Sequence, residues 1–144
     1  MANVFDVAKY ILEEKGEMST WKLQKLCFYS QAWCLAWEGH EMFREEFEAW
    51  RNGPVCRELF NLHKGMFMID AKDLEVGNSN NLTDDEKKMI DVVIRDYGDM
   101  KPYELREQTH IEDPWIISRN GLPDNANCST VIPKPLIGSY YGSL

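Results

Sequence analysis

The sequence STWKLQKLCFYSQAWCLAWEG, residues 19–39, decides the fold class of this chain. Ser19 or Thr20 can cap the start of a helix, and Gly39 favours its end. One helical face carries Leu23, Leu26, Cys27, Ser30, Trp33, Cys34 and Trp37, and apolar residues such as Phe28 and Ala32 lie beyond it. Because a helix that is apolar nearly all round is normally packed on several sides, we expect a central helix.

Capping residues and periodicity predict helices on both sides of this segment. The first runs from about Asn3 to Lys15 and stops at Gly16. Thr83 and Glu86 form a capping box ahead of the apolar face of a later helix. Two prolines at first-turn positions predict the starts of two more helices, at Lys101-Pro102 and at Asp113-Pro114-Trp115.

The remaining segments are shorter or irregular. Residues 47–54 predict a brief extended segment with a turn at Asn52-Gly53, after which Pro54 is expected to open a helix ending near Gly65. Residues 70–81 predict a polar loop. The expected fold is therefore mainly α, with five to six helices and at most a short β-hairpin. We expect a helical domain over residues 1–120 and an irregular tail over 121–144, with one short helical turn or strand, that packs on the domain or extends it.

Charge argues against nucleic acid as the partner. The 144-residue chain has a net charge of −8, and residues 38–48 carry five glutamates against Arg44. Binding to a phosphate backbone depends on Lys and Arg, which displace counterions. The acidic segment indicates either a basic protein partner or an ordinary solvated surface, and the sequence leaves both interpretations open.

Several further classes are unfavourable. No apolar run approaches the roughly 18 residues of a membrane span, and the first residues lack the features of a signal peptide, so we expect a cytoplasmic location. Cys27, Cys34, Cys56 and Cys128 are then expected to be free thiols. No cysteine pair has the spacing of a zinc site, so neither a metal nor another cofactor is expected.

The segment from Thr109 to Trp115 is the best catalytic candidate, although the usual catalytic motifs are absent. His110 can act as a general base if Glu112 or Asp113 orients it. Alternatively, these residues cap a helix and bond neighbouring backbone groups. We favour the structural interpretation, which makes this chain a binding protein rather than an enzyme.

Two other groups are candidates for partner contact. Arg51 beside Trp50 can form a cation–π recognition surface, or the Trp can fill the core while the Arg stays solvated. Lys22 and Lys25 oppose the dipole at the start of the central helix, so we expect them to have acidic partners, with pairing inside the chain favoured over pairing with another protein.

Three segments together resemble the Panacea antitoxin family, also called the SocA-like or phage-associated protein family, over roughly residues 4 to 120. The first segment is Lys22-Leu23-Gln24-Lys25-Leu26, continuing to Tyr29, Gln31, Ala32 and Trp33. The second comprises Phe47, Ala49, Trp50, Gly53, Pro54 and Val55. The third comprises Leu105, Arg106, Thr109, His110, Glu112, Pro114, Trp115 and Arg119.

The resemblance implies a helical binding module that neutralises a small toxin by direct contact. Some members are described as adaptors that hand the toxin to a cytosolic protease, and members in phages and prophages suggest an inhibitor of a host protein as the alternative. The motif residues expected at the partner surface are Lys22, Lys25, Trp50, Arg51, His110 and Glu112. An enzyme that uses His110 as its base is the least favoured interpretation.

Overall fold

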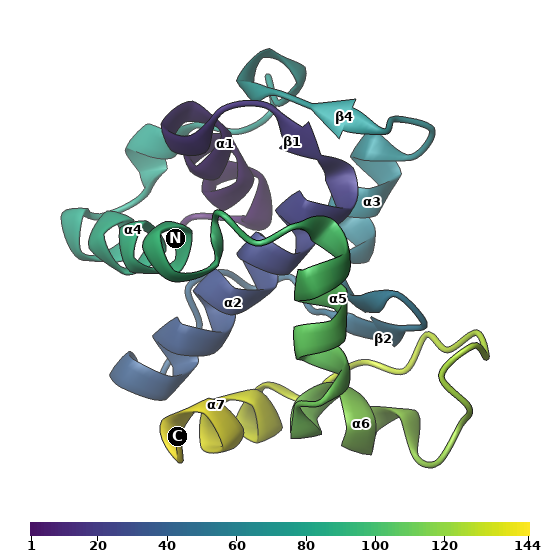
Figure 1. The fold of residues 1–144 in the computed structure, drawn as a ribbon. Helices are drawn as coiled ribbons and strands as arrows, with labels where there is room; N and C mark the ends of the chain where they lie inside the picture. The colour runs from purple at the N-terminus through teal and green to yellow at the C-terminus, as the bar shows by residue number, and fades with distance from the viewer.

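The central helix organises the computed structural model, which describes residues 1–144 (Figure 1). The helices are α1 (Val4–Lys15), α2 (Thr20–Glu38), α3 (Arg57–His63), α4 (Asp84–Tyr97), α5 (Pro102–His110), α6 (Asp113–Arg119) and α7 (Lys134–Gly142). Two antiparallel strand pairs complete the structure: β1 (Met18–Ser19) with β4 (Met68–Ile69), and β2 (Glu48–Trp50) with β3 (Gly53–Val55). The mainly helical class is confirmed, but the number of helices is seven, which corrects the expected five to six.

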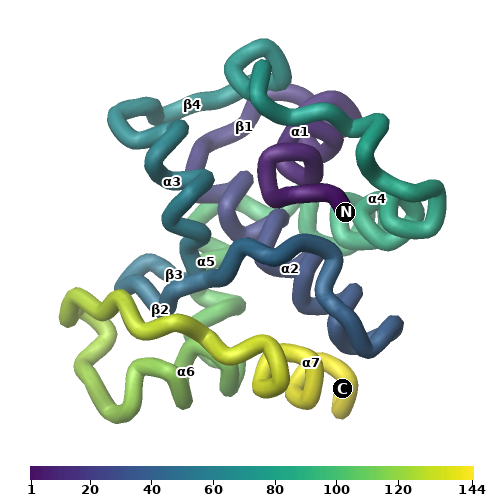
Figure 2. The backbone as a smooth tube through the Cα atoms, turned by 180° about the vertical axis from the view of Figure 1, so that it is seen from behind, coloured from purple at the N-terminus to yellow at the C-terminus, as the bar shows by residue number.

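Helix α2 is the central element that its apolar surface predicts. It packs against α1, α4, α5, α7 and the β2–β3 hairpin, and both views show it running through the middle of the molecule (Figures 1 and 2). Leu23 and Cys34 on one face of the helix and Phe28 beyond that face are all buried. Ser19 caps its start by accepting a hydrogen bond from the Lys22 N–H (3.1 Å), and Gly39 ends it in the left-handed conformation.

The predicted helix starts agree with the structure wherever local residues form the cap. Thr83 and Glu86 exchange the two hydrogen bonds of a capping box at the start of α4. Pro102 and Pro114 lie in the first turns of α5 and α6. Local hydrogen bonding and a fixed proline φ thus suffice to place these three starts.

Pro54 does not open a helix, and this prediction was wrong. It lies in β3 opposite Ala49, and Ala49 directs its N–H to Thr130 (2.8 Å), so the missing N–H of proline leaves no gap in the pairing. The side chain of Gln24 bonds both backbone groups of Cys56, at 2.8 Å to the N–H and 3.1 Å to the carbonyl. These bonds hold the chain extended as far as Cys56, and α3 begins at Arg57.

Residues 121–144 contain the seventh helix, α7, whose 9 residues exceed the one short helical turn expected there. Helix α7 packs along α2, with Ile137 and Tyr141 buried between them. Gly138 looks like a helix breaker in the sequence, but it lies within α7 and faces Leu35 of α2. Before α7, Thr130 and Ile132 exchange backbone hydrogen bonds with the chain at β2, so this segment runs beside the hairpin (Figure 2).

The loop between β4 and α4 contains two short 3-10 helices, η1 (Ala71–Asp73) and η2 (Ser79–Asn81). Its one buried residue between them, Leu74, fixes the loop to the core. All four cysteines are free: three are buried, and Cys128 is half-buried. None of the helices combines the length and the apolar character needed to cross a bilayer.

Candidate functional site

Side chains from three helices hold the backbone of the β2–β3 hairpin. Each side chain comes from one of the three sequence motifs and lies within hydrogen-bond distance of a different hairpin carbonyl oxygen. The contacts are Lys25 Nζ to Pro54 (3.2 Å), His110 Nε2 to Arg51 (2.8 Å), Trp115 Nε1 to Trp50 (2.7 Å) and Arg119 Nη1 to Ala49 (2.8 Å). The motif residues thus converge on one element and fix where its side chains point.

Gly53 explains how the hairpin approaches α2 and α5 so closely. Its φ of +111° is a conformation that side-chain-bearing residues rarely adopt. A Cβ on Gly53 would also lie 2.5 Å from Lys25 Cε and 2.9 Å from Thr109 Oγ1. Both the backbone conformation and the lack of space therefore require glycine at this position.

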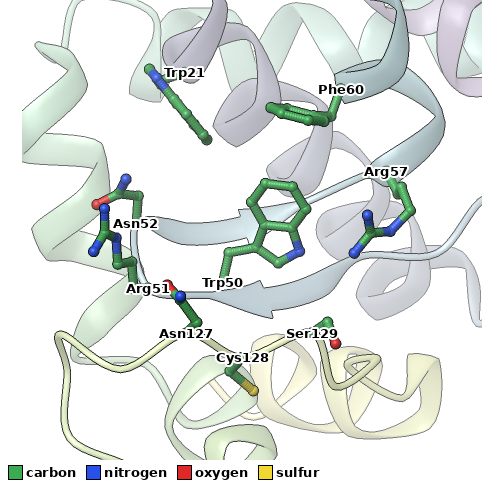
Figure 3. Close-up of a pocket in the computed structure, with 9 residues that line it drawn as sticks. All are labelled: Trp21, Trp50, Arg51, Asn52, Arg57, Phe60, Asn127, Cys128 and Ser129. Atoms are coloured by element: carbon green, nitrogen blue, oxygen red, sulfur yellow. The ribbon is translucent and has the colours of Figure 1, made fainter. Parts of the chain in front are cut away.

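An aromatic cleft of about 560 Å³ lies beside the hairpin. The half-buried Trp50 ring lies with Trp21 of α2 and Phe60 of α3, and the Phe60 ring centroid is 4.9 Å from that of Trp50 and 6.4 Å from that of Trp21 (Figure 3). Asn127, Cys128 and Ser129 contribute a second wall from the C-terminal segment. The cleft therefore combines residues within the motifs with residues far from them in sequence.

Arg57, rather than Arg51, is the cation that partners Trp50. Its guanidinium lies 5.3 Å from the Trp50 ring centroid and bonds the Glu48 carboxylate through two nitrogens, at 3.1 and 2.8 Å. Although burial acts in the other direction, hydrogen bonds from Arg57 and Trp50 lower the pKa of Glu48. Arg51 is exposed at the tip of the hairpin, next to the cleft.

A smaller cleft of about 170 Å³ adjoins the first and shares Trp21 and Asn52 with it. Its other lining residues are Lys25, Pro102, Tyr103 and Arg106. Arg106 donates from Nε to the Asn52 side-chain oxygen (3.3 Å). Neither cleft is lined by a carboxylate.

The expectation that Lys22 and Lys25 have acidic partners within the chain was wrong, because neither forms an ion pair within 4 Å. Lys25 is only 2% exposed, so a partner can reach it only through the smaller cleft, which it lines. Burial, and then the nearby Arg106, lower the pKa of Lys25 from 10.5 to about 7. Lys22 is half-buried, and desolvation together with Lys15 lowers its pKa, although Asp99 opposes this.

His110 and Glu112 do not form a base and its orienting carboxylate. The two ring nitrogens of His110 lie 2.6 and 2.8 Å from the carbonyl oxygens of Arg106 and Arg51, and burial lowers the pKa of His110 although both carbonyls raise it. Glu112 is 4% exposed and accepts hydrogen bonds from Tyr29 and Tyr141, both at 2.7 Å, and from Gln108 at 3.0 Å. These contacts favour the structural interpretation of the Thr109–Trp115 segment, and they place Glu112 too deep for direct partner contact.

Most of the acidic segment is engaged inside the molecule. Glu41 pairs with Lys134 (3.1 Å), and Glu45 accepts from the Val4 N–H (3.0 Å). Glu48 pairs with Arg57. Only the exposed Glu38 and Glu46 are left to make an unpaired acidic surface, which favours the solvated interpretation of this segment.

Sequence reasoning missed Trp21, Arg57, Phe60, Tyr103 and Arg106 as lining residues. In the sequence, Phe60 only lies within the helix expected after Pro54, and Trp21 precedes a motif without standing out from it. Aromatic residue types suit a core and a binding cleft equally well. Only the proximity of α2, α3 and the hairpin separates these two roles.

No cluster of three metal-ligating side chains is present.

A family model described as "Antitoxin SocA-like, Panacea domain" matches residues 23–116, which is 94 of the 144 residues. This chain therefore belongs to the SocA-like Panacea antitoxin family. No curated protein and no solved structure matches it significantly. The matched range contains the hairpin and the Lys25, His110 and Trp115 contacts, whereas Asn127, Cys128, Ser129 and α7 lie outside it.

Proposed function

We propose that this chain is an antitoxin-like module that neutralises a small toxin by binding it at the hairpin and its aromatic cleft. Membership of the antitoxin family supports a binding role rather than a catalytic one. The observation that carries the choice of surface is the fixation of four hairpin carbonyls by motif side chains, while Trp50 and Arg51 border an open cleft.

The composition of this surface suits tight protein binding. Trp, Tyr and Arg are the residue types most enriched at the energetic centres of interfaces. Because the hairpin is already held by side-chain hydrogen bonds, little conformational freedom remains to be lost when a partner binds. Trp50 and Arg51 are then the contacting residues among those that the sequence singles out.

The other sequence candidates take supporting roles in this proposal. His110 holds the Arg51 carbonyl, so it positions the hairpin tip. Glu112 joins α2 to α7 through Tyr29 and Tyr141 and thereby secures the C-terminal segment that walls the cleft. Lys22 lies half-buried at the start of α2 and lines neither cleft. A protease adaptor or a phage-encoded inhibitor of a host protein would use the same surface, and the identity of the partner distinguishes these roles.

Co-expression with the product of the adjacent gene tests the proposal. Growth is scored for the neighbour alone, for both proteins together, and for variants of this chain, and complex formation is measured by pull-down. We expect the neighbour to be toxic alone and harmless when this chain binds it. A harmless neighbour, or toxicity that persists despite the presence of folded protein, would rule out the antitoxin role.

Variants then test the surface. Arg51→Ala removes an exposed side chain that makes no intramolecular hydrogen bond, and Trp50→Ala opens the cleft. We expect each to weaken complex formation by about 10-fold or more, as truncation of an interface hot spot does. Phe67→Ala is the matched control, because Phe67 is 76% exposed and lies away from the cleft lining. If the control and the hairpin variants behave alike, the partner binds elsewhere.

A further inference from the structure

The two adjoining clefts have a charge opposite to that of the chain as a whole. The chain has 24 acidic residues against 16 Lys and Arg, yet the cleft linings contain four cations and no acidic residue. These cations are Lys25, Arg51, Arg57 and Arg106. Glu48 neutralises Arg57 from outside the linings, which leaves three cations without a carboxylate. A cleft of this kind suits a ligand that is both apolar and anionic.

Lys25 is the least expected of these cations. Its ammonium group is buried, with one hydrogen bond to the Pro54 carbonyl and the Trp21 ring centroid 5.5 Å away. An ammonium group has three donors and is costly to bury without a counter-ion. The lowered pKa of Lys25 expresses that cost, and Arg106 increases it. An anion bound in the smaller cleft would offset both the free-energy cost of burying the Lys25 charge and its repulsion by Arg106.

We propose that the smaller cleft binds the carboxylate of an Asp or Glu side chain on the partner, between Lys25 and Arg106, while a neighbouring apolar side chain of the same segment enters the aromatic cleft. This inference rests on the proposed function, because it assumes that a protein binds beside the hairpin. Since the two clefts share Trp21 and Asn52, residues close together in one short peptide can reach both.

The dimensions and charge favour a carboxylate side chain over a nucleic acid. A volume of about 170 Å³ accommodates a single side chain, whereas the adjoining 560 Å³ accommodates a large apolar one. A nucleic acid would extend beyond the clefts and meet the acidic remainder of the chain, whose net charge is −8. A short acidic and aromatic peptide stays within the two clefts, where all charged lining residues are cations.

Selection from a random heptapeptide library against the full chain tests the inference directly, because the library does not require an identified partner. Enriched peptides are synthesised together with isosteres in which Asp becomes Asn or Glu becomes Gln. Their Kd values are measured by calorimetry against the wild type, Lys25→Met and Arg106→Gln. Lys88→Met is the control for loss of a positive charge, because Lys88 is exposed on α4, across α2 from the hairpin (Figures 1 and 2).

We expect the enriched peptides to carry an acidic residue near an aromatic or large aliphatic one. The amide isosteres, Lys25→Met and Arg106→Gln should each raise Kd by about 10-fold to 100-fold, the range for losing a hydrogen bond to a charged group. Lys88→Met should change Kd by less than about 2-fold, because exposed distant charges are screened. If Lys25→Met fails to fold, Arg106→Gln and the isosteres decide the question.

Failure of this inference is distinguishable from failure of the proposed function. One outcome would overturn the carboxylate subsite but keep the aromatic cleft as a binding site. In that outcome the peptides bind Trp50→Ala more weakly than the wild type, but their Asn or Gln isosteres bind the wild type as well as the acidic peptides do. Peptides that bind Trp50→Ala as well as the wild type would overturn both. No enrichment, or tighter binding of a phosphoserine peptide or an oligonucleotide than of the acidic peptides, would also overturn the carboxylate subsite.

Discussion

Residues 38–48 carry five glutamates, whereas the clefts beside the hairpin carry four cations and no carboxylate. Three of these glutamates have partners within the molecule, namely Lys134, the Val4 N–H and Arg57, and the other two are exposed. The clefts leave Lys25, Arg51 and Arg106 without an acidic partner. The net charge of the chain therefore differs from the local charge of the clefts, and the unpaired cations mark the surface at which we propose that a partner binds.

The hairpin cleft depends most strongly on the absence of a side chain at position 53. We expect Gly53→Ala to lower the free energy of unfolding by about 3–5 kcal/mol, because backbone strain and overpacking each cost roughly 1–3 kcal/mol. Gly65→Ala is the matched control: it shares a positive φ of +86°, but a Cβ there meets nothing within 4 Å. Urea denaturation of both variants separates strain from crowding, and equal losses would show that the close approach to Lys25 is unimportant.

Removing the buried cation should stabilise the protein at low pH. The folded pKa of Lys25, about 7, lies below its ordinary value of 10.5, so above pH 7 the unfolded state binds more protons and wild-type stability rises with pH. Below pH 7 the full burial cost is present. Lys25→Met removes this burial cost but also loses the hydrogen bond to Pro54, which contributes about 1 kcal/mol. We therefore expect the free energy of unfolding of Lys25→Met at pH 6 to exceed that of the wild type by roughly 2–4 kcal/mol.

This advantage should disappear near pH 10, where the folded wild type no longer carries the charge. Thermal or urea unfolding across that range measures it, with Lys88→Met as the variant in which no such pH dependence is expected. A Lys25→Met protein that is less stable at pH 6 would show that the ammonium group is a structural requirement, which would weaken its assignment to a ligand.

Glu48 belongs to the acidic segment and pairs with Arg57 of the cleft lining, so changing it alters the charge of both regions. Glu48→Gln removes the charge that neutralises Arg57 but keeps an oxygen that can accept from Trp50 Nε1 (2.8 Å). We expect affinity for acidic peptides to rise by about 2-fold to 5-fold, a gain typical of one partly exposed charge. Calorimetry at low and high salt measures it, and the gain should shrink as salt increases. Weaker binding would mean that Glu48 positions Arg57 for the partner.

The exposed glutamates should have the smallest effect. Because Glu38 and Glu46 make no ion pair, replacing both with Gln should change stability by less than about 0.5 kcal/mol and partner affinity by less than about 2-fold. Wild-type association rates at two salt concentrations provide the comparison. A large loss of association rate in the double variant would restore the acidic segment as a steering surface.

Sequence predicts the elements of this fold better than the site. The apolar surface of α2, the Thr83–Glu86 capping box and the prolines of α5 and α6 are local signals, and the structure agrees with each. The motif resemblance also identifies the family correctly. The extended conformation at Pro54 and helix α7 were missed because distant partners determine them: Gln24 extends the chain after Pro54, and α2 provides the surface on which α7 forms.

The candidate site could be predicted only in part. Trp50 and Arg51 are recognisable from residue type, and the structure places both beside an open cleft. The same reasoning assigned Lys25 and Glu112 to the surface, although both are buried. Burial of a polar side chain depends on what packs over it. The hairpin covers Lys25 and α7 covers Glu112, and each covering element is distant in sequence from the residue that it buries.

The sequence by itself determined a mainly helical chain with a central apolar helix and membership of an antitoxin family. Those properties follow from short-range periodicity, capping and motif order, none of which depends on long-range contacts. Tertiary structure alone decided that the motif side chains hold one hairpin, that Arg57 replaces Arg51 at Trp50, and that Lys25 lies buried without a carboxylate. The residues in these contacts are 7 positions apart for Trp50 and Arg57 and 70 positions apart for Ala49 and Arg119. Many other side chains have the same chemistry, and the packing of the elements decides which of them meet.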